Sequence, residues 1–155
     1  MRVVLAVVLS AVLTCSVLAQ GQEVEPARSM VLETVLKFYA AFNSHGWDKA
    51  TEFATEDWNH INPFGGRTAG RASTVDDLKR VHSTFLKGVT DEFEMADIRF
   101  ATADVAVATV VSRMSTYTTP DGAEHRNDRN IRTFVVVKRS GRWQIMQDHN
   151  TIIAP

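Results

Sequence analysis

The sequence predicts an α+β fold in which helices pack on one face of a curved antiparallel sheet. Before Gly88 the chain has segments whose apolar residues recur at helical spacing, with one short alternating segment among them, whereas after Gly88 apolar and polar residues alternate as in strands. The later strands are separated by short turns, which join antiparallel neighbours. The 155 residues are 45% hydrophobic and 23% charged, which is typical of a single globular domain. Helices followed by strands indicate the α+β class.

The N-terminus has the features of a secretory signal peptide. Met1-Arg2 supplies a positive start, and residues 3–13 are apolar apart from one serine. Small residues stand at the first and third positions before a cut after Ala19. We therefore expect a secreted or periplasmic protein that has no membrane attachment after cleavage. An uncleaved anchor or a buried N-terminal helix is the alternative.

The predicted domain organisation follows from that cleavage. Residues 1–19 are the signal peptide, residues 20–28 a polar tether, and residues 29–155 a single domain. A lipoprotein processed at Cys15 is a second alternative, which the threonine before this cysteine disfavours. Cleavage after Ala19 removes the only cysteine. The mature domain would then be held together by its core and not by disulfides.

Three helices are expected in the N-terminal half. The first is capped by Ser29 and carries an apolar stripe over residues 31–42. The second is short, over residues 47–54. The third opens at Ser73 or Thr74 and carries His82 on its apolar stripe. Five strands are expected, over residues 58–64, 93–100, 105–117, 129–139 and 143–153.

The turn between the last two strands predicts which side chains share a face. Counting outward from a two-residue turn at Ser140-Gly141 pairs Arg132 with His149. One face then carries Arg132, Gln147 and His149 beside apolar residues, as a binding pocket requires. Asp148 would point to the opposite face unless a β-bulge intervenes. Because both faces hold apolar residues and the helices cover only one, we expect a homodimer through the other.

Polar residues occupy several positions where apolar ones are expected. Trp58, His60 and Asn62 share one face of the first strand, and His82 lies on a helix stripe. Each buried polar group needs a hydrogen-bond partner or a ligand. A core residue with its hydrogen bonds satisfied is the alternative for each of them, and a shared cavity explains them together.

Composition and motifs argue against several classes of function. Lys+Arg is 17 and Asp+Glu is 18, without the basic excess of a nucleic-acid-binding protein. No metal-binding spacing of histidines, no GxSxG motif and no phosphate loop is present. The glycine-rich residues 65–70 are expected to form a hairpin turn. We therefore expect no cofactor, no metal ion and no nucleic acid.

Several local signatures together resemble the SnoaL-like and SgcJ/EcaC-type domains of the nuclear transport factor 2-like superfamily. The resemblance covers roughly residues 31–151. It lies in the segments Phe38–Asn43 with Trp47-Asp48, Glu56–Trp58, Ile61–Gly65, Gly70-Arg71, His82, Asp104–Val107, Gly141–Ile145 and His149–Thr151.

The resemblance implies a cone-shaped fold with a pocket between the concave sheet and the helices, and dimerisation through the sheet. It implies that this pocket is lined or bordered by Asn62, His82, Arg132, His149 and Asn150. Some relatives are isomerases, cyclases or dehydratases that use an Asp–His or Asp–Tyr pair. No such pair matches residue by residue in this sequence.

Three functions therefore stay open. The first is an exported protein that binds a small molecule, with Asn62, His60, Trp58, Arg132, Asn150 and Tyr39 as candidate ligand-binding residues. The second is a cofactor-independent enzyme that transfers a proton on a small carbonyl compound. It would use His149 or His82 as the base and Arg132 as the oxyanion partner. The third is a non-catalytic dimerisation module.

Overall fold

The structure, a computed structural model, describes residues 25–153. The predicted signal peptide and residues 20–24 of the predicted tether lie outside the described residues. The chain divides into two units, residues 1–30 and residues 31–155, and the described part of the first, residues 25–30, is helical. No helix among the described residues is long and apolar enough to span a membrane.

The N-terminal helix covers residues 25–43 and begins earlier than predicted. Ser29 does not cap it, because the Ser29 hydroxyl donates back to the carbonyl of Glu25 within the helix. The predicted apolar stripe is confirmed by the burial of Val31, Val35, Phe38, Tyr39 and Phe42.

The expectation of three helices is wrong, because the described residues contain two α-helices. The segment predicted as the second helix forms only a short 3₁₀ turn, η1 (Ala50–Glu52). Strand β1 (Ala54–Ile61) starts directly after it, and the carbonyl of Phe53 already accepts a hydrogen bond from Ile145. This pairing with a distant strand prevails over a weak local preference for helix. The second α-helix is α2 (Arg71–His82).

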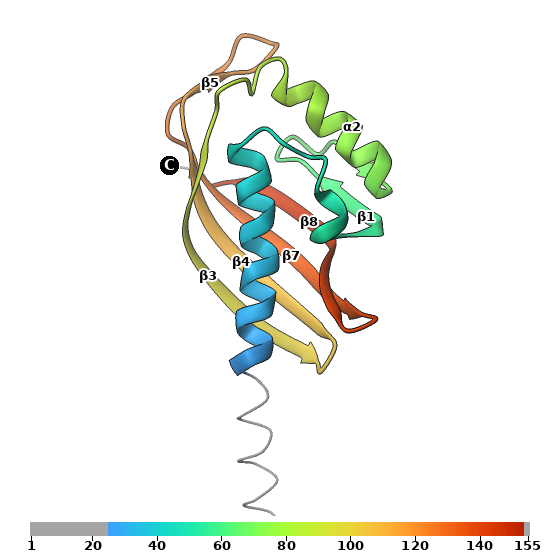
Figure 1. Cartoon of the computed structure of the whole chain (residues 1–155). Helices are drawn as coiled ribbons and strands as arrows, with labels where there is room; N and C mark the ends of the chain where they lie inside the picture. Colours follow the sequence, from blue (N-terminus) through green and yellow to red (C-terminus); the bar gives the residue numbers. More distant parts are fainter. Residues whose placement is uncertain (1–24, 154–155) are drawn as a thin grey trace, which may run out of the picture. The chain divides into compact units, whose positions relative to one another are not determined.

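A curved mixed sheet of six strands forms the body of residues 31–155, in the order β2-β1-β8-β7-β4-β3 (Figure 1). The remaining strands are β2 (Arg67–Ala69), β3 (Asp91–Thr102), β4 (Val105–Met114), β7 (Arg129–Arg139) and β8 (Arg142–Ile152). The neighbours are antiparallel except β1 and β8, which run parallel. The glycine-rich turn after β1 joins it to β2 as a hairpin, as predicted.

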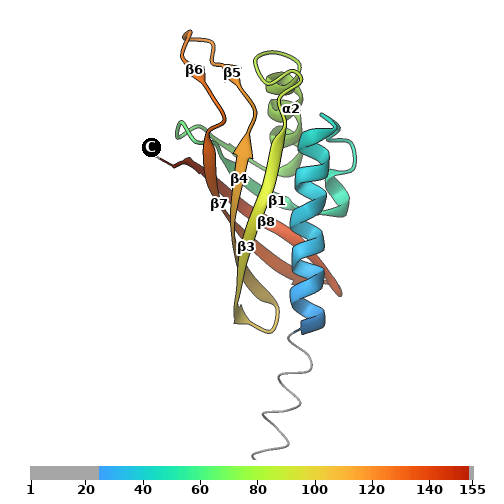
Figure 2. The same cartoon turned by 90° about the vertical axis from the view of Figure 1, so that its left-hand side faces the viewer.

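A second, two-stranded sheet extends beyond the end of β4. It consists of β5 (Tyr117–Thr118) and β6 (Glu124–His125), which the sequence patterns did not separate from the neighbouring strand and turn. Figure 2 shows this hairpin projecting past the upper end of the main sheet, which is also the end where α2 lies.

A β-bulge in β8 changes the predicted pairing of the last two strands. The turn at Ser140-Gly141 has positive φ at both residues and pairs Arg139 with Arg142, as predicted. The register then shifts by one residue at Met146. Arg132 therefore pairs with Asn150, and the predicted pairing of Arg132 with His149 is wrong.

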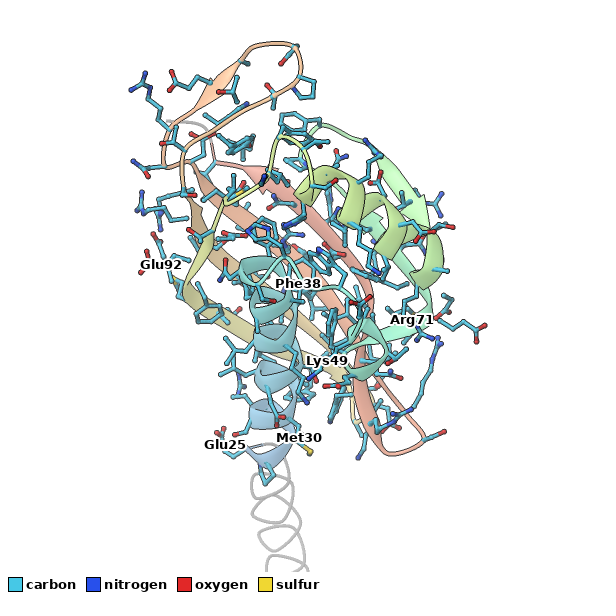
Figure 3. The ribbon with its side chains drawn as sticks, turned by 45° about the horizontal axis from the view of Figure 1, so that its top comes forward. Glu25, Met30, Phe38, Lys49, Arg71 and Glu92 are labelled. Carbon is cyan, nitrogen blue, oxygen red and sulfur yellow. The ribbon has the colours of Figure 1, made fainter. Side chains whose placement is uncertain are left out.

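An aromatic cluster holds the N-terminal helix on one face of the sheet, which we call the inner face. Phe38 lies at its centre, between the helix and the sheet (Figure 3). Its ring makes edge contacts with Trp47, Phe53, Trp58 and Phe134, with centroids 5.3–6.3 Å apart. These rings are fully buried and form the packed base on which the polar end of the inner face rests.

Candidate functional site

A cavity lies between α2, the β1–β2 turn, the start of β5 and the inner face of the sheet. Its wall is mostly apolar, with Phe38, Phe42, Leu78, Val81, Phe85 and Tyr117 among its members. Its polar members are His60, Asn62, Asp77, Arg132 and Asn150. This combination of an apolar wall and a few grouped polar side chains is typical of small-molecule sites.

The cavity is small in this structure. Its volume is about 80 Å³, roughly half that of an apolar cavity that accommodates benzene. Among its lining residues Phe64 is 57% exposed, whereas Tyr117 is buried. A ligand the size of a single ring therefore requires lining side chains such as Phe64 to move.

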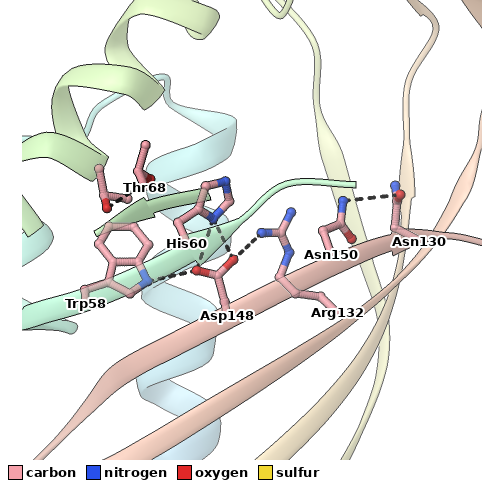
Figure 4. A network of polar contacts seen from close by, with 8 residues as sticks. Trp58, His60, Thr68, Asn130, Arg132, Asp148 and Asn150 are labelled. Carbon is pink, nitrogen blue, oxygen red and sulfur yellow. Dashed lines mark hydrogen bonds and ion pairs between the residues drawn. The ribbon is translucent and has the colours of Figure 1, made fainter. Parts of the chain in front are cut away.

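The floor of the cavity carries a histidine–aspartate pair. His60 on β1 places its Nδ1 2.9 and 3.1 Å from the two carboxylate oxygens of Asp148 on β8. Trp58 Nε1 donates to the same carboxylate at 2.8 Å, and Arg132 Nη1 donates to it at 2.6 Å (Figure 4). Asp148 is fully buried and His60 is 6% exposed. Each oxygen of Asp148 thus has charged or polar partners.

The charges around Asp148 keep it ionised. Burial alone would raise the pKa of this carboxyl, but His60, Arg132 and the indole N–H of Trp58 outweigh burial and hold its pKa below the usual value. The pKa of Arg132 is raised despite its burial, because Asp148 and its other acidic neighbours stabilise its charge. Arg132 also stacks over the Phe38 ring, 4.8 Å from the centroid.

Asn62 is held rigidly at the edge of the cavity by its own turn. Its Oδ1 accepts from the backbone N–H groups of Phe64 at 3.0 Å and Gly66 at 2.9 Å. A Cβ at Gly66 would lie only 2.5 Å from Asn62 Nδ2, so glycine is required for this close approach. Because Oδ1 is occupied, Nδ2 is the group that Asn62 can offer to a ligand.

The polar strip on the inner face continues from Asn150 toward β3. The Tyr39 hydroxyl, the Ser112 hydroxyl and both Asp91 oxygens are buried there without a complete hydrogen bond among the described residues. Burial raises the pKa of Tyr39 to about 12 and raises that of Asp91 as well, although the charge of Arg132 opposes both shifts. Both shifts oppose ionisation of these groups.

His82 lies outside the cavity, in a separate cluster. Its Nδ1 is 2.7 Å from Nδ1 of His45, and its ring packs on Phe42 and Trp47. Burial and the neighbouring His45 lower the pKa of His82 to about 4. The imidazole is therefore neutral at ordinary pH and is bound to another imidazole.

His149 lies on the opposite face of the sheet from the cavity. The bulge at Met146 turns Asp148 and Asn150 inward, and the His149 side chain is exposed. The expectation that His149 and His82 meet in one pocket is wrong, because each lies in different surroundings. Asp148 was expected on the opposite face unless a β-bulge intervenes, and the bulge at Met146 brings it to the inner face.

The other predicted residues are placed as follows. His60, Asn62, Arg132 and Asn150 line the cavity. Trp58 lies behind the floor and donates to Asp148, and Tyr39 lies at the buried end of the strip. The sequence patterns missed Asp77 and Asp148 as members of the site. The register expected for the last two strands assigned Asp148 to the wrong face.

Within residues 25–153, no three His, Cys, Asp or Glu side chains come together as a set that could hold a metal ion. The polar groups of the floor are instead paired with one another: an imidazole with a carboxylate, and the carboxylate with a guanidinium. Such an arrangement can hold and move a proton and can stabilise negative charge on an oxygen.

Solved structures with the same fold have low sequence identity to this chain. An uncharacterised protein with a cystatin-like fold from Caulobacter vibrioides has a TM-score of 0.79 and 24% identity, over 83% of this chain and 90% of that one. A nuclear transport factor 2-like superfamily protein from Salmonella enterica has a TM-score of 0.72 and 14% identity, over 85% of this chain and 94% of that one. A hexachlorocyclohexane dehydrochlorinase has a TM-score of 0.73 and 11% identity, over 86% of this chain and 90% of that one.

The sequence itself matches a family. None of the curated proteins matches the chain. The SnoaL-like domain matches residues 35–146, a range that includes the N-terminal helix from its middle onward and most of the sheet but ends before Asp148 and Asn150. The chain is therefore a member of the SnoaL-like family, and its fold is that of the nuclear transport factor 2-like protein above.

Proposed function

We propose that the protein binds a small, mainly apolar carbonyl compound in the cavity and that His60 transfers a proton there without a cofactor. The observation that carries this proposal is the His60–Asp148 pair on the floor of an otherwise apolar cavity. Sequence patterns favour binding slightly over catalysis, because they identify no acid–base pair. The bulge in β8 supplies one, so we favour proton transfer over binding alone.

The pairing with Asp148 determines which nitrogen of His60 acts on the ligand. An ionised carboxylate only accepts hydrogen bonds, so His60 Nδ1 carries the proton that lies between them. Nε2 of the neutral ring then has the free lone pair, and it points away from Asp148 (Figure 4). Nε2 would accept a proton from the carbon next to the ligand carbonyl, and Asp148 would stabilise the resulting imidazolium.

Negative charge that develops on the ligand oxygen has donors within the same cavity. Arg132 lines it with a guanidinium that is fixed by Asp148 and by the Phe38 ring. Asn62 Nδ2 and the Asn150 amide line the same cavity. Preorganised donors of this kind stabilise an enolate-like oxygen most strongly in a water-poor site.

The name of one structural neighbour is compatible with this chemistry. A dehydrochlorinase removes hydrogen chloride, so its substrate loses a proton in that reaction. At 11% identity the likeness shows the fold alone. The proposal therefore depends on the residues of this chain.

Exchange of a ketone α-hydrogen for deuterium tests the proposal directly. The full chain is incubated with 1-phenyl-2-propanone in D₂O, and loss of the benzylic proton signal is followed by NMR. We expect catalysed exchange that falls about 10²–10⁴-fold in His60→Gln and persists in His149→Gln. Equal rates in the wild-type protein and in His60→Gln would overturn the role of His60.

We further propose that the protein is exported and forms a homodimer through the outer face of the sheet. The signal-peptide features of residues 1–19 support export. Exposed Met95 and Ile131, with half-buried Val107, Val111 and Val135, support a contact on the outer face. Light scattering of the mature protein distinguishes a dimer from a monomer, and Ile131→Lys should weaken a dimer.

A further inference from the structure

His60 borders a second space besides the cavity, a hollow between the β1–β2 hairpin and α2. The volume of this hollow is about 230 Å³, which is room for several water molecules at about 30 Å³ each. His60, Asn62 and Asp77 line both spaces. The other residues that line the hollow are not large apolar ones: Gly66, Arg67, Thr68 and Arg80. We call it the polar hollow, because water can enter it more readily than the apolar cavity.

The polar hollow has the hairpin on one side and α2 on the other. His60 of β1 pairs with Thr68 of β2, so both side chains lie on the same face of the hairpin. Thr74 of α2 donates to the Thr68 hydroxyl at 3.2 Å, which holds the helix against this face. Asp77 follows one helical turn after Thr74, on the same side of α2. Asp77 therefore borders the polar hollow from the helix, and His60 borders it from the hairpin.

Asp77 also connects the polar hollow with the solvent. Its side chain is 25% exposed, and it forms an ion pair with Arg80, whose side chain is 67% exposed. Asp148, the partner of His60 on the floor of the cavity, is fully buried. A proton on the Asp77 carboxylate can therefore leave to water, whereas a proton on Asp148 has no contact with the solvent.

The proposed reaction requires such a route for the proton on His60. Proton abstraction breaks a C–H bond of the ligand, leaves the electron pair on the enolate and places the proton on Nε2. A ligand that fills the small cavity excludes water from that side of the ring. Without another route the proton returns to the carbon from which it came. Exchange with the solvent thus requires an opening on a side of His60 that the ligand does not occupy.

We propose that the polar hollow is the proton exit of the site and that Asp77 carries the proton between His60 and the solvent. This inference rests on the proposed function of the cavity and adds a residue to it. The proton passes from Nε2 through water in the polar hollow to the Asp77 carboxylate, which releases it to the solvent. A solvent proton returns along the same path to the enolate carbon, so His60 and Asp77 end in their starting states.

Deuterium exchange in a matched pair of variants tests the proton exit. The full chain is incubated with 1-phenyl-2-propanone in D₂O, and loss of the benzylic proton signal is followed by NMR. We expect Asp77→Asn to lower the rate by about tenfold or more without changing the affinity for the ketone measured by calorimetry. Arg80→Gln breaks the same ion pair but keeps the carboxylate, so its exchange rate should stay close to that of the wild-type protein.

Added formate distinguishes a proton carrier from a structural role of Asp77. Formate is small enough to enter the polar hollow and supplies the carboxylate that Asp77→Asn lacks. We expect formate to restore most of the exchange rate of Asp77→Asn and to leave the wild-type rate unchanged. A structural defect caused by the substitution would not respond to formate.

The outcomes separate the proton exit from the role of His60. A wild-type exchange rate in Asp77→Asn would overturn the proton exit and leave His60 as the base. A loss that formate does not restore, or an equal loss in Arg80→Gln, would also overturn it, because the ion pair would then serve the structure of α2. Absence of exchange in the wild-type protein would overturn both proposals.

Discussion

The molecule contains two buried histidines whose surroundings are opposite in character. His60 faces a carboxylate that is itself held by an arginine and a tryptophan. His82 faces a second imidazole and is otherwise surrounded by aromatic rings. Both are nearly fully buried, at 6% and 4% exposed. Burial alone therefore does not indicate which histidine can do chemistry.

The partner of each ring decides its role. A carboxylate fixes the tautomer of His60 and stabilises the ring when it gains a proton. Burial and then the neighbouring His45, which adds no negative charge, make gaining a proton at His82 unfavourable, and its pKa falls to about 4. We therefore assign His60 to the site and His82 to the packed core. The variants below test this distinction, from the largest expected effect to the smallest.

Removing the charge of Asp148 should have the largest effect on stability. Asp148→Asn leaves Arg132 buried without its counter-charge, and the loss of one partner from a buried ion pair costs about 3–5 kcal/mol. Urea unfolding monitored by tryptophan fluorescence measures this free energy. Asp57→Asn is the matched control, because its pair with Arg139 is exposed and contributes about 1 kcal/mol or less. Equal losses in the two variants would contradict the account.

The stability of the protein should fall as the pH falls from 6.5 to about 4. In this range the unfolded chain binds a proton at His82 that the folded protein, with a pKa of about 4, does not. Allowing for solvent screening, we expect a loss of about 2 kcal/mol in the free energy of unfolding. The lowered pKa of Asp148 acts in the same direction at lower pH, because its contribution disappears as the carboxylate is protonated.

The variant His82→Asn isolates the histidine contribution to that pH dependence. Its unfolding free energy should change less between pH 6.5 and 4 than that of the wild-type protein. His149→Asn removes an exposed histidine and should keep the full wild-type slope. A slope that is unchanged in His82→Asn would show that other groups cause the loss.

Removing the charge of Asp91 should change stability only slightly, in the direction opposite to the loss expected for Asp148→Asn. Its oxygens are buried without complete hydrogen bonds, and burial raises its pKa above the usual value. Asp91→Asn removes a charge that burial disfavours, so we expect stability at pH 7 to stay constant or rise by about 1 kcal/mol. A loss of more than about 2 kcal/mol would mean that the charge on Asp91 is needed by Arg132.

Much of the fold could be predicted from the sequence because its signals are local. The apolar stripe of the N-terminal helix, the turn at Ser140-Gly141 and the bounds of β7 all follow from spacing and turn chemistry. The 3₁₀ turn that replaces the second helix could not be predicted in this way. It results from the pairing of β1 with β8, two strands about ninety residues apart in sequence, as Trp58 and Asp148 illustrate.

The candidate site could be predicted only in part, because one bulge decides it. His60, Asn62 and Arg132 are identified as polar residues on partly apolar faces, and Asn150 is implied by the family resemblance; all four line the cavity. The pair that we assign to chemistry was missed, because inserting Met146 as an extra residue exchanges the faces of Asp148 and His149. Both registers place apolar residues on both faces, so alternation gave no indication of the bulge.

The most direct test of the central claim is the protonation of the His60 ring. Long-range ¹H–¹⁵N NMR of the ¹⁵N-labelled protein, at a pH where the ring is neutral, distinguishes the two nitrogens, and His60→Gln assigns the signals. The account predicts a proton on Nδ1, toward Asp148, and a free lone pair on Nε2. A neutral ring with the proton on Nε2 and none on Nδ1 would contradict it.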